Sequence, residues 1–326
     1  MTDIPATAPA PSSPATAGQP DGNKLLITGA NGHLGSRLIP AVAETRGVVA
    51  LVRSASAALA LQTTVDTLPP VQTSNITITQ LEYTDVTALQ DAAQGCNEVI
   101  HLAGILKESP WSTYQQAHED TTAALLSALE GLTIRRIHYL SIVGSAPTAS
   151  NACLASKGRA EELLLAAPHP ALILQVPMVL GEGDYAAQAL NAQARKALNV
   201  VFAPNARDQP LYAGDVVDAL TAASALPADF NARLTLAGPE ALNKRQLISR
   251  AASMVNNKTR VIGLPGGLAL ALATLLEAVS KNPPITSPMM EILHHDDHYD
   301  PEPACSTLGI SLTPLDEMLE NVLLRV

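Results

Sequence analysis

Short runs of Val, Ile and Leu alternate along the chain with longer stretches whose apolar residues recur at helical spacing. The short runs show little polar alternation, which is typical of strands covered on both faces. The expected strands are Lys24–Thr28, Gly47–Val52, Ile76–Leu81, Glu98–Leu102, Arg136–Ser141 and Ala171–Val176. The expected helices between them are His33–Glu44, Ala55–Leu68, Val86–Gln94, Thr113–Glu130 and Cys153–Ala166. This repetition predicts an α/β fold built on a doubly wound parallel sheet.

The pattern loosens after Gly181, where a further strand at Arg233–Leu236 and a helix from about Lys244 are expected. We therefore predict a sheet domain over residues 24–180, with a returning segment at 208–238. Residues 181–207 and 239–326 are predicted to form a smaller, mostly helical lobe for a substrate or partner. Residues 1–23 hold five Pro and no Lys or Arg, so we expect a disordered tail and no secretory or mitochondrial leader.

Composition and charge narrow the classes of partner. Twenty Lys and Arg against thirty Asp and Glu give a net charge of −10, and only nine residues are aromatic. Such a chain repels phosphate backbones and lacks stacking rings, so no nucleic-acid partner is expected. The three cysteines are scattered, which indicates a reducing compartment and a cytoplasmic protein.

One apolar stretch leaves membrane association open. The uncharged run from Val261 to Leu276 is broken by Pro265-Gly266-Gly267. The remainder, about Leu268–Val279, is shorter than the roughly 20 residues that span a bilayer. It is expected to be a buried helix, or else a helix lying on a membrane surface or a protein partner.

The first strand runs into TGANGHLG at residues 28–35, with glycines at positions 29, 32 and 35. A tight strand-to-helix turn with this spacing lets the backbone and the helix N-terminus approach a pyrophosphate. The expected dinucleotide contacts in the loop are Gly29, Asn31, Gly32, His33, Leu34 and Gly35. Residues 45–65 contain no Asp or Glu, and the second strand ends at Arg53, which could pair with a 2′-phosphate. The sequence therefore favours NADP(H) over NAD(H).

Several segments resemble the atypical and extended short-chain dehydrogenase/reductases, an epimerase- and dehydratase-like family. TGANGHLG is similar to their TGxxGxxG loop, and QVPMVLGEGD and AGDVV are similar to two later landmarks. The resemblance implies a Rossmann fold and further cofactor contacts at Asp85 and Val86 in EYTDV, at Leu102, Ala103 and Gly104 in HLAG, and at Pro177.

The resemblance also implies acid–base catalysis by a Tyr in Y-x-x-x-K, but here the tyrosine position holds Cys153, four residues before Lys157. None of the six tyrosines has Lys four residues later. Ser141 resembles the family's substrate-positioning Ser, and Lys157 its ribose contact. Cys153 has three possible interpretations. It could be a small apolar residue that fills the space of the missing tyrosine in a protein that binds cofactor without turnover, or it could be a thiol acid/base. Alternatively, another residue such as Tyr185 or His101 could supply the proton.

The degraded site resembles one subgroup, the dehydrogenase-like accessory subunit of respiratory complex I and its bacterial relatives. That resemblance implies a structural, sensing or assembly role with weak or no turnover. The alternative is an active NADP-dependent reductase, epimerase or isomerase with a substitute acid, acting on a small molecule that the sequence does not name. The segment from His294 to Asp300 could suggest a metal site, but a solvated acidic turn is the preferred interpretation and no metal is expected.

Overall fold

The computed structural model describes residues 24–264 and 296–324. Seven parallel strands form one sheet in the order β11-β6-β5-β4-β1-β2-β3. The strands are β1 (Lys24–Thr28), β2 (Gly47–Val52), β3 (Ile76–Gln80), β4 (Cys96–His101), β5 (Arg136–Ile142), β6 (Ala171–Val176) and β11 (Ala232–Thr235). The prediction of a doubly wound parallel sheet is confirmed.

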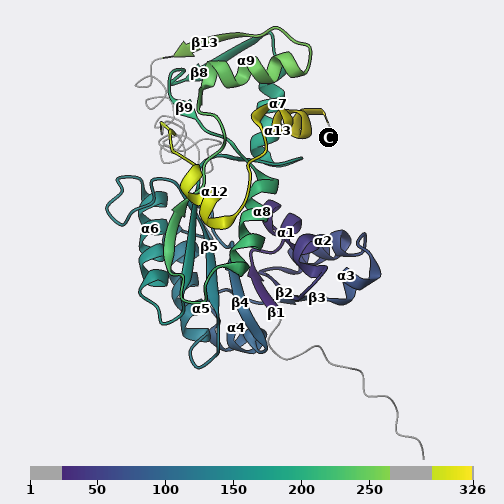
Figure 1. The fold of residues 1–326 in the computed structure, drawn as a ribbon, viewed down its shortest axis with the longest axis vertical. Helices are drawn as coiled ribbons and strands as arrows, with labels where there is room; N and C mark the ends of the chain where they lie inside the picture. Colours follow the sequence, from purple (N-terminus) through teal and green to yellow (C-terminus); the bar gives the residue numbers. More distant parts are fainter. Residues whose placement is uncertain (1–23, 265–295, 325–326) are drawn as a thin grey trace, which may run out of the picture.

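Helices cover both faces of this sheet (Figure 1). One face packs against α1 (His33–Ala43), α2 (Ala55–Val65), α8 (Ala213–Ala222) and α12 (Glu302–Leu308). The other packs against α4 (Val86–Ala93), α5 (Thr121–Ala128) and α6 (Ala152–Leu165). The first set buries Leu, Ile, Val and Ala and the second mainly Leu and Ala, so both faces of the Val- and Ile-rich sheet are covered. Short helical turns occur at α3 (Pro70–Ser74) and at Ala223–Ala225.

The expected helix at Thr113–Glu130 consists of two parts. Gln115–Asp120 forms a π-helical stretch, η1, which continues directly into α5. π-Helical turns are rare and occur frequently at functional sites, and no feature of the apolar spacing indicates one.

The smaller lobe lies above the sheet in Figure 1 and has a core of its own. Its helices are α7 (Tyr185–Ala194), α9 (Lys244–Met254) and α13 (Leu315–Leu324), which agrees with the expected helical C-terminal region. It also holds short strands that were not expected: the pairs β7 (Val179–Leu180) with β10 (Leu211–Tyr212), β9 (Arg207–Asp208) with β12 (Leu242–Asn243), and β8 (Leu198–Phe202) with β13 (Arg260–Leu264).

The predicted tail at residues 1–23 lies outside the described residues, and two further sequence features do so wholly or partly. The apolar stretch Leu268–Val279 is one, and His294 and His295 are the other. Asp296 is described, and its carboxylate pairs with the Arg207 guanidinium at 2.9 Å. Within residues 24–264 and 296–324, no His, Cys, Asp or Glu cluster could hold a metal ion. In the same ranges, every helix is too short or too polar to cross a bilayer.

Candidate dinucleotide site

The glycine loop lies where the carboxyl ends of β1 and β4 meet, which is the switch point of the strand order. Gly29 has φ +68°, and a Cβ there would lie 3.0 Å from the Ala103 nitrogen on the loop after β4. A Cβ on Gly35 would lie 2.6 Å from the Ala30 carbonyl oxygen, so only glycine lets α1 pack this closely on the loop. The two loops therefore touch through backbone atoms.

The helix that follows the loop keeps its first N–H groups without a side-chain cap. Gly32 occupies the N-cap position, α1 begins at His33, and its first turn carries no acid. Asn31 stands in the turn before this helix, and Leu34 lies in its first turn. Uncapped N–H groups and the helix dipole together favour an anion at this end of α1.

The second strand brings Arg53 to the same edge, beside a tyrosine that the sequence analysis did not single out. The Tyr83 hydroxyl accepts a 2.7 Å hydrogen bond from the Gly29 N–H and donates one of 2.7 Å to the Leu51 carbonyl. The Arg53 guanidinium lies 5.9 Å from the centre of the Tyr83 ring. Burial raises the pKa of Tyr83 to about 12, so its hydroxyl stays protonated and braces the loop. The only sequence signal was its place in EYTDV.

Asp85 and Val86 stand at the start of α4. The Asp85 carboxylate is the N-cap and accepts a 3.0 Å hydrogen bond from the Ala88 N–H. Val86 is 38 % exposed. Pro177 is buried between β6 and β7. Asp85 therefore caps α4, besides the cofactor contact expected of it.

Lys157 extends from α6 beneath the HLAG loop. Its Nζ donates a 2.8 Å hydrogen bond to the Leu140 carbonyl and lies 4.4 Å from the centre of the Tyr139 ring. A Cβ on Gly104 would lie 3.3 Å from the same Nζ. Burial lowers the pKa of Lys157 to about 8. The ammonium is thus placed at the floor of the loop, and burial brings its pKa close to physiological pH.

Cys153 stands one turn before Lys157 on α6 and is completely buried. Its Sγ lies 3.7 Å from the Ile105 carbonyl oxygen, to which the thiol donates. Burial raises the pKa of Cys153 to about 11, and the nearby Lys157 opposes this shift only in part. Cys153 therefore behaves as a small protonated side chain in the packing around the loop.

The Ser141 side chain belongs to a buried polar network. We name this network, formed by Ser141, Glu161, Gln175 and Arg233, the Glu161 network. Its hydroxyl donates to the Glu161 carboxylate, which is completely buried on α6. Gln175 donates to both oxygens of that carboxylate at 2.9 and 3.1 Å, and Arg233 also pairs with it. The structure thus brings Cys153 and Lys157 to one helix face while engaging the Ser141 hydroxyl elsewhere.

Two buried histidines flank the same region, and only one of them was expected. His101 Nδ1 lies 2.7 Å from Thr28 Oγ1, and its Nε2 lies 3.2 Å from Thr122 Oγ1. His118, on the π-helical stretch, has Nδ1 2.7 Å from Ser156 Oγ and Nε2 3.1 Å from the Ile105 backbone. Burial lowers the pKa of each to about 3, so both rings are neutral. Tyr185, by contrast, is 79 % exposed at the start of α7.

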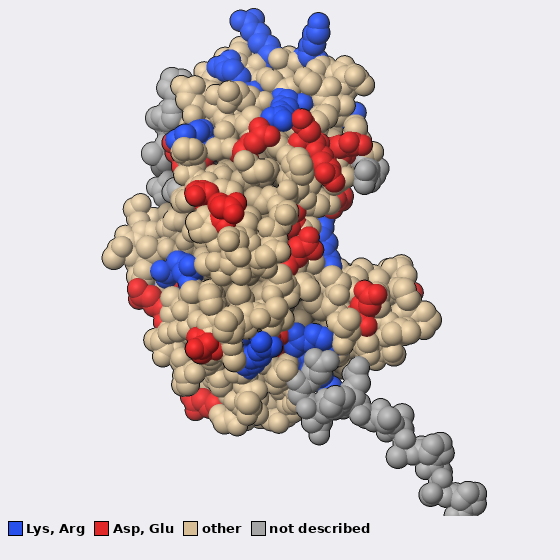
Figure 2. Space-filling view, in the orientation of Figure 1, with Lys and Arg blue, Asp and Glu red and all other residues tan. Residues whose placement is uncertain are grey.

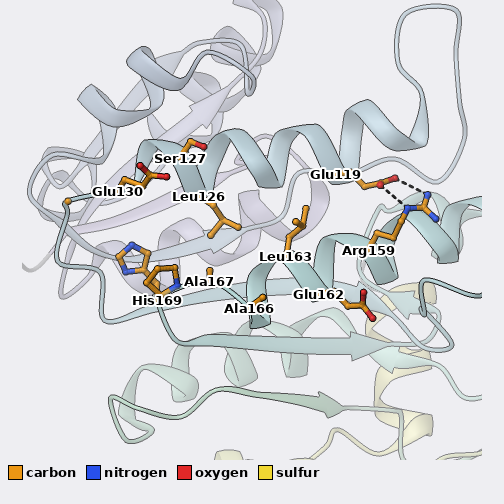
Figure 3. A pocket seen from close by; sticks show the side chains of 12 residues that line it. Glu119, Leu126, Ser127, Glu130, Arg159, Glu162, Leu163, Ala166, Ala167 and His169 are labelled. Atoms are coloured by element: carbon orange, nitrogen blue, oxygen red, sulfur yellow. Dashed lines mark hydrogen bonds and ion pairs between the residues drawn. The ribbon is translucent and has the colours of Figure 1, made fainter.

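A groove of about 730 Å³ on the outer side of α5 and α6 lies apart from these residues (Figure 3). Leu126 and Leu163 lie along it, and an ion pair between Glu119 and Arg159 of 2.7 Å closes one end. None of the sequence-predicted site residues lines this groove.

Comparisons with known proteins agree on the fold and on the dinucleotide. A family model described as NAD(P)H-binding matches residues 29–197. A ceramide reductase of Caulobacter vibrioides is 27% identical over 194 residues, which are 59% of this chain and 61% of the relative. The match thus spans less than two thirds of that relative's length.

Solved structures extend the similarity over most of the chain. A nucleoside-diphosphate-sugar epimerase from Staphylococcus aureus superposes with a TM-score of 0.70 at 14% identity, covering 91% of this chain and 99% of that one. A UDP-glucuronic acid 4-epimerase from Bacillus cereus, solved with UDP-glucuronic acid and NAD, superposes with a TM-score of 0.69 at 18% identity, covering 91% and 97%. At these identities the likeness shows the fold.

Proposed function

The chain belongs to the NAD(P)H-binding family, and from this premise we propose a short-chain dehydrogenase/reductase-type protein that holds the dinucleotide with weak or no turnover. Its role is structural, sensing or in assembly. The observation that carries the proposal is Cys153, a completely buried thiol with a pKa raised to about 11, at the position four residues before Lys157. Reduction of a carbonyl needs a proton donor whose pKa lies near the working pH, and this thiol is far from it.

The dinucleotide would lie over the glycine loop, with its pyrophosphate against the N-terminus of α1. Gly29, Asn31, Gly32, His33, Leu34 and Gly35 would surround the phosphates. The HLAG loop, Leu102 to Gly104, and Lys157 would hold the nicotinamide ribose, while Asp85, Val86 and Pro177 would border the two ends. What supports this arrangement is the close backbone contact between the two loops and the reach of Lys157 beneath Gly104.

The preference for NADP(H) rests on Arg53. Its guanidinium lies over Tyr83, whose hydroxyl is hydrogen-bonded to the glycine loop, so the cation is held at the edge where an adenosine ribose would lie. A 2′-phosphate there would accept from the guanidinium. Arg53→Ala should weaken NADPH binding about 10- to 100-fold and leave NADH binding within about threefold, since a charge-assisted hydrogen bond contributes about 1.5–3 kcal/mol.

The test is a titration of purified, cofactor-stripped protein with NADPH and NADH, by calorimetry and nicotinamide fluorescence. Reduced nicotinamide should then persist for hours in the presence of carbonyl and nucleotide-sugar substrates. Oxidation at ordinary enzyme rates would overturn the low-turnover proposal. Failure of both dinucleotides to bind would instead overturn the cofactor site itself.

A second candidate is an active reductase of a lipid carbonyl, favoured by the similarity to a ceramide reductase. NADPH would deliver hydride to the carbonyl carbon, and the resulting alkoxide would take a proton. Among the buried groups around the loop, Lys157 has the pKa closest to neutrality, about 8. Activity toward a ceramide-class ketone that falls as pH rises above about 8, and disappears in Lys157→Met with the dinucleotide still bound, would establish this candidate. The same activity without that pH dependence would assign the proton to another group.

A further inference from the structure

The tip of the smaller lobe carries an apolar surface where a polar one is expected. β8 and β13 pair in parallel, with Leu198 opposite Arg260 and Val200 opposite Ile262. Alternate residues of the pair, Asn199, Val201 and Val261, are buried in the lobe. Because side chains alternate across a strand, the other face points outward. We name this outward face, formed by Leu198, Val200, Arg260 and Ile262, the ribbon face.

Three of the four side chains on the ribbon face are large and apolar. Leu198 is 50 % exposed, Val200 is 53 % exposed and Ile262 is 39 % exposed. A two-stranded ribbon with one buried face ordinarily presents polar side chains on the other. Single exposed apolar residues are common, but three neighbours on one small sheet mark a surface that meets something apolar.

Cations gather around this apolar face, in contrast to the acidic chain as a whole. Residues 185–207 and 241–264 hold eight Lys and Arg and no Asp or Glu, in a chain with a net charge of −10. Figure 2 shows Lys and Arg side chains at the top of the molecule, in the region of β13, β8 and α9. Three of the eight are paired with acids: Arg207 with Asp296, Lys244 with Asp208, and Arg250 with Glu240 and Asp316.

Five of these cations are exposed and form no ion pair with the described residues: Arg195, Lys196, Arg245, Lys258 and Arg260. Two of these residues are hydrogen-bonded at the ribbon. The Arg245 guanidinium donates to the Val261 carbonyl at 2.6 Å, and Arg260 N–H donates to the Ala197 carbonyl at 2.8 Å. Lys196 and Lys258 stand two residues before the start of β8 and β13 respectively.

We propose that the ribbon face docks this protein on the anionic surface of a lipid bilayer. Leu198, Val200 and Ile262 enter the boundary between headgroups and acyl chains, while the five unpaired cations lie against the anionic headgroups. The charge argues against a second copy of the chain as occupant, because two such groups of cations would repel each other. This surface is separate from the dinucleotide site, so the inference holds whether or not the protein turns over.

The test is sedimentation of the full chain with vesicles of phosphatidylcholine alone and of phosphatidylcholine with phosphatidylglycerol. The wild-type protein should bind the mixed vesicles and stay in the supernatant with the neutral ones, and added salt should weaken binding. Lys196→Gln/Lys258→Gln/Arg260→Gln should lower the partition constant by roughly fivefold per cation. Leu198→Ser/Val200→Ser/Ile262→Ser should lower it by about tenfold or more.

Matched controls separate this surface from the rest of the chain. Lys258→Gln is compared with Lys24→Gln, and the apolar triple variant with Leu59→Ser/Val71→Ser, which changes residues 71 % and 68 % exposed on the other lobe. The controls should bind as the wild type does, and thermal unfolding confirms that all variants fold. Binding unaffected by the ribbon variants, or absent from mixed vesicles, overturns the proposal. A wild-type dimer that the apolar variant abolishes would assign the face to a second copy and overturns it too.

Discussion

Two residues one helical turn apart on α6 show how burial decides chemistry at this site. Burial raises the pKa of Cys153 to about 11 and lowers that of Lys157 to about 8, so both shifts favour the neutral form. The sequence predicts the C-x-x-x-K spacing and the shared helix face. It does not predict the protonation states, because these depend on how deeply the rest of the fold covers each side chain.

The thiol of Cys153 should be inert in the native protein. Its pKa is raised, as are those of buried Cys96 and Cys305, so thiolate is scarce until well above neutral pH. At pH 8, an aromatic disulfide reagent should label the native chain at least about 100-fold more slowly than the urea-unfolded chain. Cys153→Ala identifies the signal of that residue. Rapid labelling of Cys153 at neutral pH would show a reactive thiolate and revive the thiol acid/base.

Lys157 should lower the free energy of unfolding of the cofactor-free protein. The pKa of Lys157 in the folded state, about 8, lies below its pKa in the unfolded chain. Burying the charged lysine therefore destabilises the folded state in full below about pH 8. This destabilisation decreases as the pH rises from about 8 toward the pKa of the unfolded chain. Lys157→Met should therefore stabilise the cofactor-free protein by about 1–2 kcal/mol at pH 7, after the lost contacts with Leu140 and Tyr139 are counted.

Urea unfolding at pH 7 and near pH 10 measures this effect. The gain should shrink at the higher pH, and Lys24→Met, at an exposed lysine, should show no such dependence. Dinucleotide binding should weaken in Lys157→Met at either pH. A variant less stable than the wild type at pH 7 would mean that the ammonium is well solvated or paired in the native state.

At the scale of elements, the strands and helices of the sheet follow from the apolar pattern, whereas the short pairings do not. The six strands from Lys24 to Val176 are long, apolar and flanked by turns, so their local pattern suffices. Strands such as β7 and β10 have two residues each and exist only because distant segments meet. The contacts of Tyr83 with the glycine loop and of His118 with Ser156 were not predicted for the same reason. Their hydrogen-bond partners lie 54 and 38 residues away in the sequence.

The Glu161 network should contribute strongly to the stability of the packing between α6 and the sheet. A buried carboxylate that accepts from Ser141, Gln175 and Arg233 leaves several donors unpaired when its charge is removed. Glu161→Gln should lower the free energy of unfolding by about 2–4 kcal/mol. Its neighbour Glu162 is exposed on the same helix, so Glu162→Gln should stay within about 0.5 kcal/mol. Equal effects of the two changes in urea unfolding would show that the network contributes little.

At the scale of the whole molecule, the two lobes have separate cores. The sheet and its helices enclose two apolar clusters, and the smaller lobe encloses a third. The expected dinucleotide contacts lie at one edge of the sheet, and the ribbon face lies at the tip of the smaller lobe (Figure 1). Cofactor binding and surface docking are therefore assigned to different parts of the molecule.

NADPH should then protect one lobe from hydrogen exchange and leave the other nearly unchanged. At about 100 times the dissociation constant, the ligand adds about 2.7 kcal/mol to the stability of the state that binds it. Slower exchange should appear in residues 28–35, around Arg53, in the HLAG loop and along α6. The amides of β8, β13 and α9 should change little, because they belong to the third core. Equal protection of that lobe tip would show that the lobes unfold as one unit, and that occupancy of the dinucleotide site stabilises the ribbon face.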